Sequence, residues 1–168
     1  MMSWWLSEVE ASFEMIELSF LKGYLMSNLI VIDASAVLSL LLNEPMAAKV
    51  LSATIGTRLI SPASLPYEIA NALSARVRAN NHTMLSKEYA MTAYKLYQAM
   101  PIELVPIDNS LHAQVFDIAT TQRMYSYDAY LLLLAKIHQV PLLTLDGTGK
   151  KQGLIQYAAM LGIPCIQL

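Results

Sequence analysis

The sequence predicts an α/β protein built on a parallel sheet, and three observations predict it. Short apolar runs such as Leu29 to Asp33 alternate with longer helix-forming stretches throughout the chain after Met26. Serine, proline or glycine stands where most of these stretches should begin or end. The chain has 168 residues, enough for one domain with a sizeable core. Strands that alternate with helices form βαβ units, so we expect a parallel sheet covered on both faces.

Each expected element follows from its local pattern. Strands are expected at 29–33, 58–61, 103–107, 141–145 and 164–168. Helices are expected at 34–42, from about 45 to 51, 64–80, 86–100, 109–121 and 126–138, and from the Gly147 to Gly149 turn to Gly162. Ser64, Ser86 and Ser126 are the expected N-caps, and Pro66 suits a first helical turn.

The composition is unusually apolar for a globular chain. Apolar residues make up 55% of it and charged residues only 14%. The longest apolar stretch, Leu29 to Leu42, contains Asp33 and is too short to cross a bilayer. We therefore expect no membrane segment and a surface for self-association or a partner protein. Cys165 is the only cysteine, which excludes a disulfide framework and fits a reducing cytoplasm.

Residues 1–25 differ from the rest of the chain. Apolar residues recur at helical spacing from Trp5 to Phe20, and four glutamates lie mostly off that stripe. An amphipathic helix closed by Gly23 is expected, and its acids exclude a signal peptide. Two interpretations stay open: the extension is an artefact of start-site choice before Met26, or it contacts a partner. The expected organisation is this extension at 1–25 and one domain at 26–168.

Four acidic residues occupy places where an apolar core is expected: Asp33, Glu68, Asp128 and Asp146. Asp33 and Asp146 end predicted strands, whereas Glu68 and Asp128 lie in the first turns of predicted helices. In a parallel sheet these places meet at one edge, outside the carboxyl ends of the strands. Grouped carboxylates repel one another unless they are protonated or bind a cation. A site for Mg²⁺ or Mn²⁺ that hydrolyses phosphodiester bonds is the economical interpretation.

Other residues support this interpretation more weakly. Ser35 and Asn71 stand close to Asp33 and Glu68 in sequence, where they suit supporting roles. From Met26 onward there are 10 basic and 9 acidic residues, so the surface outside the acid cluster is expected to be mildly basic. The candidates for RNA contact are Arg76, Arg78, Arg123, Lys150 and Lys151, although ordinary solvated charge is the commoner role. Most tyrosines are interpreted as core or interface filling.

The acid-bearing segments resemble a known family. Val31-Ile32-Asp33-Ala34-Ser35, Glu68 to Leu73, Tyr127 to Ala135 and Leu143-Thr144-Leu145-Asp146 are similar to the four acidic motifs of PIN-domain nucleases, specifically VapC-type toxins. The resemblance implies a three-layer α/β/α sandwich with a roughly five-stranded sheet. It also implies Mg²⁺- or Mn²⁺-dependent endoribonuclease activity, a VapB-type antitoxin partner, a homodimer, and Asp33, Glu68, Asp128 and Asp146 as metal-binding and catalytic residues.

Two other functions stay open. A catalytically weak module with the same fold would bind RNA or protein, although such a module would be free to lose its acids. A phosphatase with an aspartyl nucleophile would need a second acid two residues after Asp33, where Ser35 stands. Each acid also has an ordinary structural role when taken alone, so the argument depends on all four together.

Overall fold

The sheet of this protein has four parallel strands. The computed structural model describes residues 28–79, 84–147 and 153–168. The strand order is β3-β2-β1-β4, and every pairing is parallel. The strands are β1 (Leu29–Ile32), β2 (Arg58–Pro62), β3 (Ile102–Val105) and β4 (Leu142–Leu143). The expected α/β fold with a parallel sheet is therefore confirmed.

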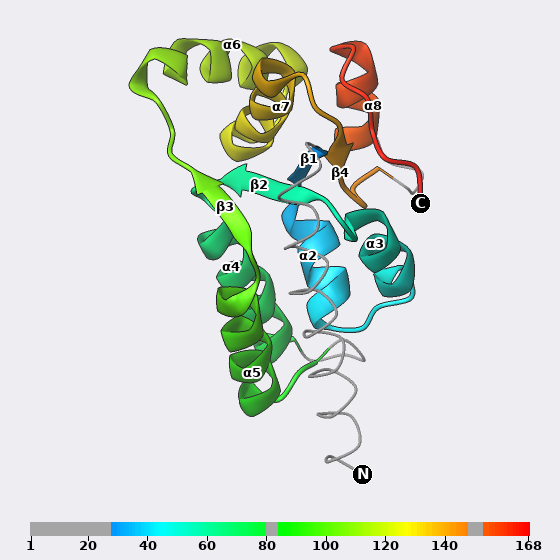
Figure 1. Cartoon of the computed structure of the whole chain (residues 1–168). Helices are drawn as coiled ribbons and strands as arrows, with labels where there is room; N and C mark the ends of the chain where they lie inside the picture. Colours follow the sequence, from blue (N-terminus) through cyan, green and yellow to red (C-terminus); the bar gives the residue numbers. More distant parts are fainter. Residues whose placement is uncertain (1–27, 80–83, 148–152) are drawn as a thin grey trace.

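Helices cover both faces of this sheet (Figure 1). The helices α2 to α5 lie on one side, and α6 to α8 lie on the other. Their bounds are α2 Ala34–Leu41, α3 Ala47–Thr54, α4 Leu65–Arg78, α5 Lys87–Ala99, α6 His112–Gln122, α7 Ser126–His138 and α8 Leu154–Met160, with a 3-10 turn at Asn109–Leu111 before α6. No helix in the described part of the chain is long and apolar enough to cross a membrane.

The period of two along β1 divides the core between the two helical layers. Ile30 and Ile32 pack with α2, α4 and α5, whereas Val31 packs with α7 and α8. The run Ala129 to Ala135 of α7 is buried throughout, because this helix lies directly on β1 and β2. A β1 strand with both faces covered leaves only its carboxyl end for polar chemistry.

The fifth expected strand, 164–168, is reduced to a single bridge between Leu142 and Cys165. Pro164 has no N–H donor, and β4 itself is only two residues long, so there is little ladder to extend. The expected strand at 141–145 is also shorter than predicted, because β4 spans only Leu142–Leu143. Leu145 N donates to the Ser35 hydroxyl instead of to a strand carbonyl, which turns the chain out of the sheet.

Of the three expected N-caps, Ser86 and Ser64 are confirmed in position, and the Ser86 hydroxyl accepts from Tyr89 N at 3.1 Å. Ser64 stands at the cap position of α4, but its hydroxyl makes no capping bond. Ser126 was the wrong residue for α7, because Tyr125 is the N-cap and Ser126 is already helical. The expected extension at 1–25 lies outside the described residues.

The order of the strands fixes where a site can form. The chain passes from β1 to β2 to β3 in one direction and then returns to place β4 on the other side of β1. In open parallel sheets, sites form at such a reversal, outside the carboxyl ends of the strands. The reversal here lies between β1 and β4, which are followed by Asp33 and Asp146 respectively.

Candidate active site

The four predicted acids influence one another electrostatically, although they come from distant parts of the sequence. Asp33 follows β1, Glu68 lies in the first turn of α4, Asp128 lies in the first turn of α7, and Asp146 follows β4. The pKa of Asp128 is raised by burial and by the charges of Asp33, Glu68 and Asp146. The sheet edge thus brings the four acids together as the sequence predicts.

Asp33 is the buried member of this group, with only 6% of its surface exposed. Its Oδ2 accepts hydrogen bonds from the Ser35 hydroxyl, from Ser35 N at 3.3 Å and from the Thr144 hydroxyl at 2.8 Å. Burial raises the pKa of this carboxyl, and the hydrogen bonds from Ser35 and Thr144 oppose that rise. Ser35 therefore contacts the Asp33 carboxylate, and its supporting role at a metal site stays a prediction.

Thr144 is a site residue that the sequence analysis missed. Its hydroxyl donates to Asp33 and accepts from Asp146 N at 3.0 Å, so one buried side chain positions two of the acids. The Ser35 hydroxyl acts in parallel, because it donates to Asp33 and accepts from Leu145 N at 2.9 Å. The available signal was a hydroxyl inside the apolar run Leu142-Leu143-Thr144-Leu145. Such a buried hydroxyl needs a partner.

Glu68 is half-buried and is held by Ser64, whose hydroxyl donates to Glu68 Oε1 at 2.7 Å. Burial raises the pKa of Glu68, the bond from Ser64 opposes this, and the charge of Asp33 adds to the rise. The expected cap residue thus holds a site acid instead of a backbone N–H. Asn71, the other predicted supporting residue, is exposed one turn further along α4.

Asp146 is the exposed acid, and its carboxylate also fixes the start of α8. Its Oδ2 accepts from Leu154 N at 3.1 Å, and its carbonyl accepts from Ile155 N at 3.2 Å. Gly153 makes this approach possible, because a Cβ there would lie 2.8 Å from Asp146 Oδ1 and 2.6 Å from Gly147 N. The chain therefore needs glycine at 153 to keep Asp146 in place.

The pKa of the Asp128 carboxyl is strongly raised. Burial, followed by the charges of Asp33, Glu68 and Asp146, raises its pKa from 3.8 to about 7. No Lys or Arg among the described residues contributes to the pKa shifts of Asp33, Glu68 or Asp128. A proton or a cation must therefore offset part of the negative charge near neutral pH.

The predicted RNA-contact residues differ in their surroundings. Arg76 pairs with Glu44 through Nη2 and Oε1 at 2.6 Å, which joins the end of α4 to the turn after α2. Arg78 is exposed, and Arg123 is exposed where it ends α6 in a left-handed conformation. Lys150 and Lys151 lie outside the described residues. These roles stay predictions, and Arg76 is the candidate with a competing partner.

The residues fit a divalent cation by their chemistry. Carboxylate oxygens are the ligands that Mg²⁺ prefers, and Mg²⁺ commonly takes one or two of them while keeping several waters. Within 28–79, 84–147 and 153–168, no group of three His, Cys, Asp or Glu side chains is arranged so that it could hold a metal ion. The fit therefore concerns one or two direct carboxylate ligands, with the other acids acting through charge and water.

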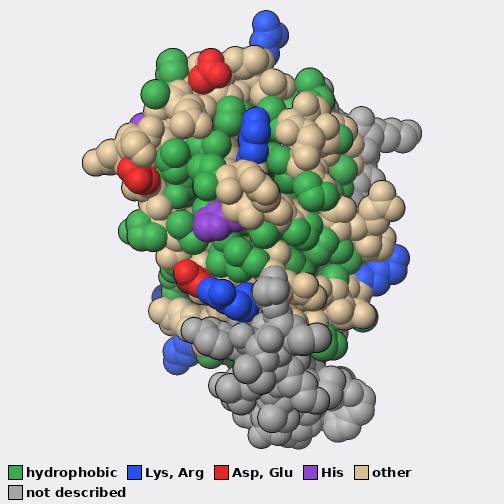
Figure 2. All heavy atoms as spheres, turned by 45° about the horizontal axis from the view of Figure 1, so that its top comes forward, with side chains coloured by type: hydrophobic (Ala, Val, Ile, Leu, Met, Phe, Trp, Pro, Cys, Tyr) green, Lys and Arg blue, Asp and Glu red, His purple; other side chains and the backbone are tan. Residues whose placement is uncertain are grey.

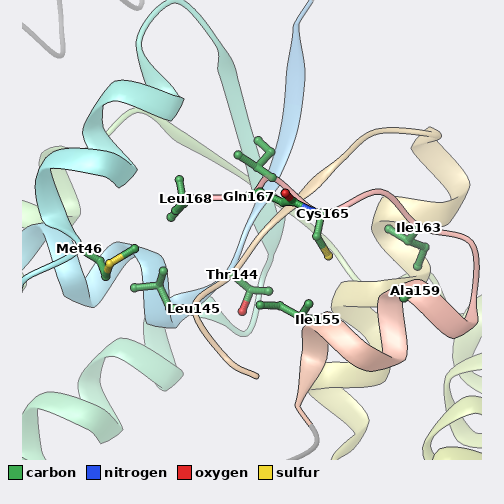
Figure 3. Close-up of a pocket in the computed structure, with 10 residues that line it drawn as sticks. Met46, Thr144, Leu145, Ile155, Ala159, Ile163, Cys165, Gln167 and Leu168 are labelled. Atoms are coloured by element: carbon green, nitrogen blue, oxygen red, sulfur yellow. The ribbon is translucent and has the colours of Figure 1, made fainter. Parts of the chain in front are cut away.

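A separate cavity of about 370 Å³ lies beside the site. Thr144 and Leu145 form one wall, Ile155 and Ala159 of α8 form another, and the C-terminal segment around Cys165 closes it (Figure 3). Among the residues that the structure describes, no Asp, Glu, Lys or Arg lines this cavity. Its wall matters for the acids because Thr144 belongs to both places.

A group of carboxylates at the reversal of a parallel sheet defines a class of acid-site α/β proteins. Comparison with known proteins identifies the family. The PIN domain family model matches residues 30–151. The chain therefore belongs to the PIN domain family, whose members are typically nucleases that use divalent metal ions. Curated protein sequences give no significant match.

Solved structures are similar to this chain at low sequence identity. The crystal structure of PAE2754 from Pyrobaculum aerophilum has a TM-score of 0.55 and 21% identity, and the match covers 80% of this chain and 92% of that one. The crystal structure of FitAcB from Neisseria gonorrhoeae has a TM-score of 0.49 and 17% identity, with 82% and 96% covered. The first of these supports the fold.

The raised pKa of Asp128 predicts how the stability of the metal-free protein depends on pH. Its folded pKa, about 7, exceeds the ordinary value of 3.8, so the folded state binds more protons between these pH values. Ionisation of Asp128 therefore costs stability progressively as pH rises from about 4 to about 7. After allowance for solvent screening, Asp128→Asn should raise the free energy of unfolding at pH 8 by about 1–2 kcal/mol and change it little at pH 4.

Urea denaturation in EDTA at the two pH values measures this difference. Asp117→Asn, on the exposed surface of α6, is the matched control and should show no such pH-dependent gain. An Asp128→Asn variant that is no more stable than the parent at pH 8 would contradict the proposed electrostatic repulsion.

The two hydrogen bonds of Thr144 predict a further effect on stability. Thr144→Val keeps the shape of the side chain but leaves Asp33 Oδ2 and Asp146 N each without one partner in a buried place. We expect a loss of about 1–3 kcal/mol in the free energy of unfolding. Thr144→Ser keeps the hydroxyl and should lose less, in the same urea measurement. Equal stability of the valine variant and the parent would show that Thr144 does not hold these acids.

Proposed function

We propose that this protein is a metal-dependent endoribonuclease that acts through Asp33, Glu68, Asp128 and Asp146. The observation that carries the proposal is a group of four carboxylates at the strand reversal of a PIN fold, where burial and then the charges of the other three acids raise the pKa of Asp128 to about 7. Among the described residues, no Lys or Arg contributes to the pKa shifts of Asp33, Glu68 and Asp128. This excess of negative charge favours the binding of a divalent cation. Mg²⁺ or Mn²⁺ is the cofactor that suits these oxygen ligands.

Each acid has its own place in the proposed chemistry. Asp33, fixed by two hydroxyls, is the best oriented of the four and is the proposed primary metal ligand. Asp128 is near its pKa at neutral pH, so it is suited to give up its proton when a cation binds. Glu68 and Asp146 complete the negative field from opposite sides of β1. When bound, the metal ion supplies an activated water and neutralises charge on the phosphate.

The proposed activity is tested directly with RNA. Purified protein incubated with a total-RNA pool and Mn²⁺ or Mg²⁺ should produce discrete cuts that are resolved by gel or by end sequencing. EDTA should abolish them, and Asp33→Asn should slow them at least about 100-fold, because it changes the group that the site holds most firmly. Asp117→Asn should cut as the parent does.

Two outcomes would contradict the nuclease. The first is cutting that survives both EDTA and Asp33→Asn, which would indicate a contaminating ribonuclease. The second is no cutting by a folded parent in either metal, which would favour the alternative of a catalytically weak module that binds RNA or protein.

The same proposal includes the biological setting of a VapC-type toxin with a VapB-type antitoxin and a homodimeric form. The apolar composition and the exposed Phe116, Ile137 and Met160 support a surface covered by protein. Light scattering should give twice the 18.6 kDa chain mass. The complex that copurifies with the product of a neighbouring gene should cleave RNA more slowly than the chain alone does. A monomer, or cleavage unchanged by that product, would count against these respective parts of the proposal.

A further inference from the structure

Two tyrosines at the start of α7 form an exposed stacked pair. The rings of Tyr125 and Tyr127 are 5.3 Å apart between centroids and only 11° from parallel. Their exposed fractions are 69% and 44%, so the stack is not core filling. Two large rings held in one orientation on the surface present a flat apolar face to solvent.

The pair borders the acid cluster. Tyr127 immediately precedes Asp128 in the first turn of α7. The pKa of the Tyr127 hydroxyl is raised by burial, then by Asp128 and Tyr125, and then by Glu68 of α4. Glu68 therefore acts on this ring from the other helix whose N-terminus reaches the site. The stack therefore begins at the residue next to Asp128, a proposed site acid.

An aromatic face would be useful for an anionic substrate here, because some of the arginines among the described residues are engaged in ion pairs. Arg76 is paired with Glu44, and Arg58 is paired with Glu103 at 3.1 Å. On the side of the molecule that carries α6, α7 and α8, hydrophobic side chains cover much of the surface, and Lys and Arg are scattered (Figure 2). A substrate attracted weakly by charge needs another source of affinity. Stacking of bases on aromatic rings supplies it without regard to phosphate charge.

We propose that Tyr125 and Tyr127 form a stacking platform for an unpaired base next to the scissile phosphate. The inference rests on the proposed nuclease function and adds a positioning role to it. A base inside a duplex cannot present its face to these rings, whereas a base in a loop or a single strand can. Any of the four bases has a face that can stack, so the platform selects for strandedness over sequence.

The first arm of the test measures steady-state cleavage of a fluorescent single-stranded oligonucleotide with Mn²⁺. The double variant Tyr125→Ala/Tyr127→Ala should raise KM roughly 10- to 100-fold with a smaller change in kcat, because stacking contributes to binding. Tyr125→Phe/Tyr127→Phe keeps both rings and should stay within about twofold of the parent. Met91→Ala, which removes a large apolar side chain 50% exposed on α5, is the control and should leave KM unchanged. Circular dichroism melts of all variants establish that they are folded.

The second arm locates the base without requiring cleavage. Oligonucleotides with 5-iodouridine at successive positions are irradiated with the parent protein, with Ca²⁺ replacing Mn²⁺ to slow cutting, and crosslinked peptides are identified by mass spectrometry. The expected crosslink is to Tyr125 or Tyr127 from one position. Making that position abasic should weaken binding to the parent and have no further effect on the double alanine variant.

The outcomes separate this inference from the proposed function. Cleavage by the parent together with unchanged KM in the double alanine variant, or with crosslinks only elsewhere, would overturn the platform and leave the nuclease intact. Equal cleavage of duplex and single-stranded RNA would also overturn it. If the folded parent neither cleaves RNA nor forms crosslinks to it, the proposed function is overturned and the platform with it.

Discussion

The burial of the Asp33 carboxylate between β1 and the segment after β4 is the constraint on which the rest of the site depends. A buried carboxyl must be hydrogen-bonded or neutralised, and here two hydroxyls from Ser35 and Thr144 donate to the same oxygen. Each of these hydroxyls also accepts one hydrogen bond from the backbone: Ser35 accepts from Leu145 N, and Thr144 accepts from Asp146 N. The segment that carries Asp146 is therefore held to the end of β1 by the same bonds that satisfy Asp33.

This arrangement explains why the acids influence one another so strongly. Asp33 is fixed at the reversal of the strand order, Asp146 is tied to it through Thr144, and the first turns of α4 and α7 bring Glu68 and Asp128 to the same edge. Asp128 cannot move far from its neighbours because α7 is buried along Ala129 to Ala135. Repulsion is thus built into the packed fold, and a cation that relieves it would also contribute to stability.

Much of the framework could be predicted from the sequence because its signals are local. The apolar run before Asp33 and the alternation of strands and helices predicted a parallel sheet, and the position of each acid at an element end predicted their convergence. The fifth strand is present only as a parallel bridge between Leu142 and Cys165, because β4, with which 164–168 pairs, is two residues long. Ser126 was wrong as a cap because a one-residue shift in a helix start leaves little trace in composition.

The remaining site residues depend on contacts between distant segments. Thr144 acquires its role only when β4 pairs with β1, a contact that spans more than 100 residues of sequence. The Arg76–Glu44 pair likewise joins α4 to the turn after α2, so an arginine suited to RNA in sequence has another partner in the fold. The exposure of Tyr125 and Tyr127 could not be predicted from the sequence, because Tyr130 and the leucines that follow it in the same segment are buried.

The central claim is that these acids bind a divalent cation together, and calorimetric titration of the metal-free protein with Mn²⁺ tests it most directly. Titrations at pH 7 in two buffers of different ionisation enthalpy also count the protons released. The account predicts binding with proton release by the parent, at least about tenfold weaker binding by Asp33→Asn and Asp128→Asn, and unchanged binding by Asp117→Asn. Equal affinity and equal proton release in the parent and both site variants would contradict it.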